Sequence, residues 1–217
     1  MEQRSFGRGQ VEWALWRAVH GVNWRNQPVP KAFLTRIKRL LEIDRDPALI
    51  DDVEVPPTAE YAFAPPPDES AESSYTLADA VCLAVALDLL DAGFKQREIV
   101  VRMRYLRPDL EKRLRKLISL PPPLTLKRLK DDHRSFIVLG QVEMTEMYPV
   151  ATSRRIKGPI LLEPVFCDGL SGLTQHLEKL MPMQRRVAVI VEIAGLAHAV
   201  SGALERAPVI RRGRPKN

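Results

Sequence analysis

Apolar positions near the start of the chain recur with the three-to-four-residue period that is typical of an α-helix. They predict one helix over about residues 9–20, ended by Gly21, and a second helix that begins at Pro30 and runs to about Ile43. The tryptophans here are most simply anchors of a core or an interface, with stacking on bases as the alternative: Trp13, Trp16 and Trp24.

The helical period is most regular in the middle of the chain. Thr76 and Asp79 match a capping box, in which two side chains bind the free backbone amides at the start of a helix. The helix that follows is apolar on more than one side, so we expect it to be buried on more than one side. A tight turn over 91–94 then leads to a helix over 96–106, and Pro108 predicts the start of a third helix.

After Arg134 the pattern changes to short apolar runs that alternate with helical segments. The expected elements are strands over 136–142 and 160–166, a helix over 170–181, a β-rich segment over 186–193 and a last helix over 196–206. One continuous helix over 184–206 is the alternative, because alanine and glutamate are plentiful there. We interpret this part as a small α+β domain for dimerisation, partner binding or ligand sensing.

Two proline-rich breaks divide the chain. Residues 55–74 combine dense proline with four acidic groups and no basic one, which predicts an extended, mobile linker. Residues 121–123 form the second break. The expected fold class is therefore mainly α, with N-terminal and central helical (helix-turn-helix-like) units followed by a small α+β C-terminal domain. The expected units are an N-terminal helical unit (1–54), the linker (55–74), a basic helical unit (75–120), the α+β domain (134–207) and a basic tail (208–217).

Charge is unevenly distributed along the chain. The 217 residues carry 33 Lys and Arg against 27 Asp and Glu, which gives a net charge of +6. Residues 75–134 carry thirteen basic and eight acidic groups, and the last ten residues carry four basic groups and no acidic one. The positive charge is concentrated in the central unit and the tail, where it favours a polyanionic partner.

Eight basic side chains crowd into 20 residues of the central unit, opposed by only three acidic ones. This density suits contacts with DNA phosphates, whereas a solvated helix face is the simpler interpretation of any single one of them. Spacings of four residues also predict ion pairs of Asp109 with Arg113 and of Glu111 with Arg115. The candidate DNA-binding side chains are Arg97, Arg102, Arg104, Arg107, Lys112, Arg113, Arg115 and Lys116.

The stretch Leu89-Leu90-Asp91-Ala92-Gly93-Phe94-Lys95-Gln96-Arg97-Glu98-Ile99 resembles part of the DNA-binding domain of MerR-family regulators. In that family a long apolar helix reaches a turn of an aliphatic residue, Gly and Phe, and the next helix opens with Glu-Ile. The resemblance covers about 35 residues of the central unit, and it implies a helix-turn-helix with DNA as its partner. The family's pattern for the base-reading helix is not visible ahead of it, so no helix is assigned to the groove.

The chain ends with Arg211-Arg212-Gly213-Arg214-Pro215-Lys216-Asn217, which resembles an AT-hook. Gly213 allows the backbone to approach the floor of the minor groove, and Pro215 favours an extended path. The guanidinium groups of Arg212 and Arg214 suit the negative potential of a narrow A·T minor groove. The tail therefore predicts binding to A·T-rich double-stranded DNA, with a disordered basic tail that aids solubility as the alternative.

No catalytic or metal-binding constellation stands out in the sequence. The run 131–133, Asp-Asp-His, suggests a metal site but is more typical of a turn before a strand. Cys167, Asp168 and His176 can be drawn as a thiol site, but Cys167 ends an apolar strand, and we expect it and Cys82 to be buried thiols in a reducing compartment. We expect no cofactor, no metal and no enzymatic activity, with an enzyme built from residues distant in sequence as a remote alternative. The histidines are scattered among different elements: His20, His133, His176 and His198.

The N-terminus has no apolar signal core, and the longest apolar stretch, 187–200, is too short and too charged to cross a membrane. We therefore expect a cytoplasmic, nucleoid-associated DNA-binding transcription regulator of a bacterium or mobile element, whose C-terminal domain forms a homodimer or binds a protein partner. The main alternative is a protein–protein interaction adaptor whose helical surface and tryptophans dock an acidic partner. An affinity for DNA that falls steeply as the salt concentration rises would distinguish the DNA-binding regulator from the adaptor.

Overall fold

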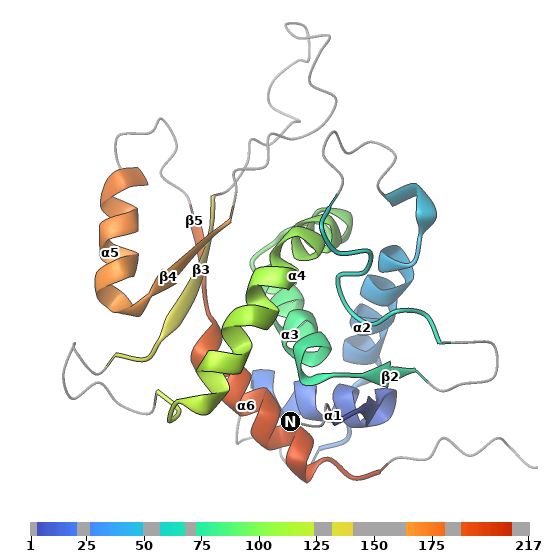
Figure 1. Ribbon diagram of the computed structural model, residues 1–217. Helices are drawn as coiled ribbons and strands as arrows, with labels where there is room; N and C mark the ends of the chain where they lie inside the picture. Colours follow the sequence, from blue (N-terminus) through green and yellow to red (C-terminus); the bar gives the residue numbers. More distant parts are fainter. Residues whose placement is uncertain are drawn as a thin grey trace, which may run out of the picture.

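The computed structural model describes residues 4–20, 27–49, 57–67, 73–123, 132–140, 164–180 and 188–209. Helices dominate, and a small sheet follows most of them along the chain, so the expected mainly α fold with a C-terminal α+β region is confirmed (Figure 1). The elements are, in order, β1 (Phe6–Gly7), α1 (Arg8–His20), α2 (Lys31–Asp44), η2 (Pro47–Leu49), β2 (Ser74–Tyr75), α3 (Leu77–Asp91), α4 (Gln96–Ser119), β3 (Ser135–Gly140), β4 (Val165–Asp168), α5 (Gly169–Leu180), β5 (Ala188–Glu192) and α6 (Ile193–Arg206).

The two N-terminal helices bury the apolar stripes that the sequence predicts. Trp16 of α1 is buried and meets Phe33 of α2 edge-on, with the ring centroids 5.2 Å apart. The interpretation of Trp16 as a core anchor is therefore confirmed, whereas Trp24 lies outside the described residues. β1 pairs antiparallel with β2, so the start of the chain lies beside the start of α3.

Helix α3 is the centre of the helical region because nearly all its side chains are apolar and buried. The predicted capping box is confirmed: Asp79 N donates to Thr76 Oγ1 (3.2 Å), and Thr76 N donates to Asp79 Oδ2 (2.7 Å). The predicted turn after it is also confirmed. Gly93 has a positive φ of 91°, which glycine adopts without strain, and its N–H donates to the carbonyl of Leu90.

Helix α4 is one continuous helix of 24 residues that passes through Pro108. The prediction of two helices that meet at Pro108 is therefore wrong. Leu106 and Leu110 are buried on the same side of the helix, whereas Pro108 faces solvent. Because the apolar stripe stays in phase across the proline, one helix buries it completely, and this outweighs the hydrogen bond that proline cannot donate.

The C-terminal sheet has the order β4-β3-β5, and both pairings are antiparallel. Alternate residues of β3 serve two cores: Ile137 packs with the helical core, and Phe136 and Val138 pack with Leu173 of α5. Figure 1 shows α5 on one side of the sheet and α4 and α6 on the other. The alternative of one helix over 184–206 is wrong, because residues 188–192 are hydrogen-bonded to β3 as β5.

The boundaries of the predicted units do not hold in the core. Helix α6, from the expected C-terminal domain, packs against α1, α3 and α4 in a single cluster with the N-terminal helices. The predicted linker is also partly core, since Ala62, Phe63 and Ala64 are completely buried in this cluster. We call residues 57–67 the strap. Proline density predicted mobility here, but the apolar run inside the strap gives it a surface to bury.

Candidate nucleic-acid interface

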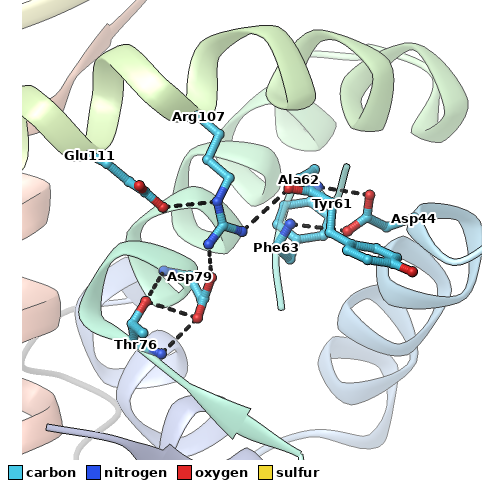
Figure 2. A network of polar contacts seen from close by, with 8 residues as sticks. All are labelled: Asp44, Tyr61, Ala62, Phe63, Thr76, Asp79, Arg107 and Glu111. Atoms are coloured by element: carbon cyan, nitrogen blue, oxygen red, sulfur yellow. Dashed lines mark hydrogen bonds and ion pairs between the residues drawn. The ribbon is translucent and has the colours of Figure 1, made fainter. Parts of the chain in front are cut away.

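The eight candidate cations lie on α4, and the N-terminal half of this helix holds the strap. Arg104 is 5% exposed, and its Nε donates to Oδ1 of the fully buried Asp44 at 2.9 Å, while its Nη2 donates to the Asp44 backbone carbonyl. The same carboxylate accepts the backbone N–H groups of Ala62 (2.9 Å) and Phe63 (3.0 Å), as Figure 2 shows. Asp44 thus joins α2, α4 and the strap, and its partners satisfy a charge that would be costly to bury alone.

Arg107 forms a second junction beside the first (Figure 2). Its Nη2 donates to Asp79 Oδ1 at 2.6 Å, its Nε to Glu111 Oε1 at 2.9 Å and its Nη1 to the carbonyl of Tyr61 at 3.4 Å. Burial alone would lower the pKa of the Arg107 guanidinium, but the nearby carboxylates raise it, those of Asp79 and Glu111 among them. Asp79 therefore caps α3 and also ties α3 to α4.

Arg102 is the most deeply buried cation of the set, at 1% exposed. Its guanidinium pairs with Glu98 at 2.9 Å and lies 5.3 Å from the ring centroid of Phe94. Burial lowers the pKa of Arg102, and Glu98 acts in the opposite direction. The prediction that Arg102 and Arg104 belong to an exposed surface is therefore wrong: Arg102 is buried beside Glu98 and Phe94 of its own segment, whereas Arg104 is buried against Asp44, 60 residues away in the sequence.

Two further candidates are exposed or half-buried but already engaged. Arg97 donates to the backbone carbonyls of Ala48 and Leu49 at 2.8 and 3.2 Å. Arg113 pairs with Asp168 of β4 at 2.7 Å and stacks on Phe166. The predicted pairs Asp109–Arg113 and Glu111–Arg115 are wrong, since Arg113 pairs across to β4 and Glu111 pairs backwards with Arg107.

The remaining three candidates form an exposed stripe on the C-terminal half of α4. Lys112, Arg115 and Lys116 are all exposed and lie within about one turn of one another on a single face. Within the described part of the chain, no acidic side chain lies within ion-pair distance of any of them. We call these three residues the α4 stripe. Their charges are free to meet an external anion.

A cleft of about 220 Å³ adjoins the α4 stripe. It lies between the C-terminal half of α4, the start of β3 and the end of β4, and Lys116 is one of its walls. Asp132 caps α5 from its floor: Oδ2 accepts Leu170 N at 2.7 Å, and Oδ1 accepts Arg134 N at 3.1 Å. Burial would raise the pKa of Asp132, but these backbone hydrogen bonds and Arg134 hold it below its usual range. The turn predicted before β3 is thus confirmed at Asp132.

The thiols offer no reactive site. Cys82 and Cys167 are both free and buried, as predicted, and burial raises the pKa of both, that of Cys82 to about 12. Among the described residues, no three His, Cys, Asp or Glu side chains are grouped so that they could hold a metal ion. His198 contacts the Leu117 carbonyl at 3.1 Å, which links α6 to the end of α4.

The tail candidates, residues 211–216, lie outside the described residues. No helix within the described ranges is long and apolar enough to cross a membrane. Comparison with family models, with curated proteins and with solved structures finds no match to this chain. Any functional assignment therefore depends on the residues themselves.

Proposed function

We propose that this protein is a double-stranded DNA-binding transcription regulator of a bacterium or mobile element. The observation that carries the proposal is the α4 stripe, whose three exposed cations have no ion-pair partner among the described residues, while the arginines earlier in the same helix are all engaged. Contacts with DNA phosphates require mobile, uncommitted cations of this kind.

Two further features support DNA over a protein partner. The helix–turn–helix of α3 and α4 contains the stretch that resembles MerR-family regulators. In the described residues only two large apolar side chains are clearly exposed, Ile190 at 41% and Val209 at 77%, and an adaptor surface normally presents a larger apolar patch. The tail, with its Arg211–Lys216 segment, supplies the proposed minor-groove contact to A·T-rich DNA.

The test compares two charge reversals that are matched in size and exposure. One variant carries Lys112→Glu and Arg115→Glu in the α4 stripe, and the control carries Lys31→Glu and Arg39→Glu on the exposed face of α2. Fluorescence anisotropy on a random-sequence duplex at low salt should show a loss of affinity of at least tenfold for the first variant and a much smaller loss for the control. Equal losses would mean that only net charge matters, and absence of binding by the intact protein would remove DNA as the partner.

The tail needs a separate variant that keeps its charge. Replacing Gly213-Arg214-Pro215 by Ala-Lys-Ala should abolish a preference for A·T-rich over G·C-rich duplexes, because the flush backbone is lost. An unchanged preference in this variant would leave only a basic tail.

A further inference from the structure

The cleft beside the α4 stripe contains donors that the fold itself does not use. Its charged walls are Arg113, Lys116, Arg134, Asp132 and Asp168, which leaves one net positive charge when His133 is neutral. Arg134 is held by Asp132 through two hydrogen bonds, at 2.8 and 3.2 Å. Asp132 is in turn committed to the start of α5, so this pair is structural.

Lys116 and His133 are the free donors of the cleft. Both side chains are exposed, and neither has a hydrogen-bond or ion-pair partner among the described residues. Arg113 is only weakly committed to its partner. The side chain of Asp168 is 66% exposed, and an ion pair exposed to solvent contributes little stability. Two donors from α4 and one from the segment just before β3 thus line the same small cleft.

We propose that this cleft binds a phosphate group, with Lys116 and His133 as donors and with Arg113 turning from Asp168 to a phosphate oxygen. Both oxygens of Asp132 accept hydrogen bonds, and Asp168 is paired with Arg113, so the cleft charge without a partner among the described residues is that of Lys116, which suits an anion rather than a cation. The volume accommodates a phosphate with its ester substituent but little more. The phosphate belongs either to a nucleic-acid backbone, in which case the inference rests on the proposed function, or to a small phosphorylated ligand.

A substitution at Asp168 tests the proposal, because an anion site and a cation site predict opposite changes in affinity. Its carboxylate competes with phosphate for Arg113 and also accepts a hydrogen bond from Ser135 Oγ at 3.3 Å. Asp168→Asn keeps the shape and removes the negative charge. This variant should bind phosphate several-fold more tightly, whereas a cleft built for a cation or a metal would bind its ligand more weakly.

The experiment titrates the full-length protein with inorganic phosphate and follows the backbone amide NMR signals of residues 113–117 and 132–135. Lys116→Gln removes a positive charge and His133→Ala removes the ring donor, so each should weaken binding by about tenfold. The double variant Lys31→Gln with Arg39→Gln lies on the exposed face of α2, outside the cleft, and it should change phosphate affinity little. Absence of phosphate binding by the unmodified protein, or weaker binding by Asp168→Asn, would overturn the proposal.

Two further titrations separate the sources of the phosphate. If duplex DNA is the source, inorganic phosphate competes with it, and Lys116→Gln weakens DNA binding as it weakens phosphate binding. If the source is a small ligand, a 5′-mononucleotide or a sugar phosphate binds more tightly than inorganic phosphate and DNA does not compete. Phosphate binding without any DNA binding would overturn the proposed function and support the cleft. DNA binding that resists all three cleft substitutions, with no phosphate signal, would do the reverse.

Discussion

The two halves of helix α4 carry similar densities of positive charge and use them in opposite ways. In the N-terminal half, Arg102, Arg104 and Arg107 turn inward and each meets a carboxylate. In the C-terminal half, the cations of the α4 stripe face solvent and have no acidic partner among the residues described. The difference shows that charge density in a sequence does not distinguish a buried, fold-stabilising network from an exposed cationic surface.

The cause lies in what covers each half. The N-terminal half is enclosed by α2, α3 and the strap, which bring Asp44 and Asp79 into reach. The C-terminal half contacts α6 through Leu117–His198 and β4 through Arg113–Asp168, and these contacts leave the α4 stripe exposed. Arginine suits the enclosed half because its fork of donors can satisfy several acceptors at once.

The largest expected effect follows from removing one partner of the buried pair. Arg104→Ala leaves the carboxylate of Asp44 buried with only backbone partners, and the free energy of unfolding should fall by about 3 to 5 kcal/mol. Urea denaturation followed by circular dichroism measures it. Arg115→Ala, eleven residues further along the same helix, is the matched control. A loss below about 1 kcal/mol for Arg104→Ala would contradict the contrast between the two halves.

The elements that rest on local chemistry were predictable. The Thr76–Asp79 capping box and the turn at Gly93 each depend on residues within a few positions, so the sequence contains all the partners. Strands β3 and β5 and helix α5 were also found close to their observed positions. Pro108 favours a helix boundary by its local chemistry, but the apolar stripe of the whole helix keeps α4 continuous through it.

The candidate site was less predictable for a physical reason. Arg104 and Asp44 are 60 residues apart, and no local pattern shows that they meet. The available signal was inside the strap, where Tyr61-Ala62-Phe63-Ala64 forms an apolar run within the proline-rich segment. The cleft likewise joins α4 to residues that follow it at a distance: the sequence marks Arg113 and Lys116 as basic candidates, Asp132 and His133 as a turn and Asp168 as part of a possible thiol site, but no local pattern shows that they meet.

The second-largest expected effect concerns the strap, which covers the N-terminal half of α4. Phe63 is completely buried, and Phe63→Ala should cost about 3 kcal/mol, the lower end of the usual range, because the strap can partly close over the space. Limited proteolysis supplies a second measurement. The strap should resist cleavage between residues 61 and 64 in the unmodified protein and be cleaved there in the variant. Rapid cleavage of the unmodified protein at these bonds would show that the strap is mobile, as its proline density predicts.

Asp88 offers a smaller effect, because it is a partly buried charge with no cation against it in the described structure. Burial and the nearby Asp91 raise its pKa to about 6. The unfolded chain then loses this proton before the folded protein does, so the residue lowers stability progressively as pH rises from about 4 to 6 and fully above that range. Asp88→Asn should therefore stabilise the protein by about 1 kcal/mol at pH 7.5, after allowance for solvent screening, and by almost nothing at pH 4. An equal gain at both pH values would show that the charge is not the cause.

The smallest expected change in stability belongs to the α4 stripe, and it completes the comparison. Lys112→Ala and Arg115→Ala remove exposed side chains that have no described ion-pair partner, so each should change the free energy of unfolding by less than about 0.5 kcal/mol. Under the proposed function the same substitutions still alter DNA binding, because each lost phosphate contact reduces the slope of log affinity against log salt by about 1. Denaturation and salt titration of the same two variants therefore separate the roles. A marked loss of stability would place these side chains in the structural network, and an unchanged salt slope would remove them from the DNA contact.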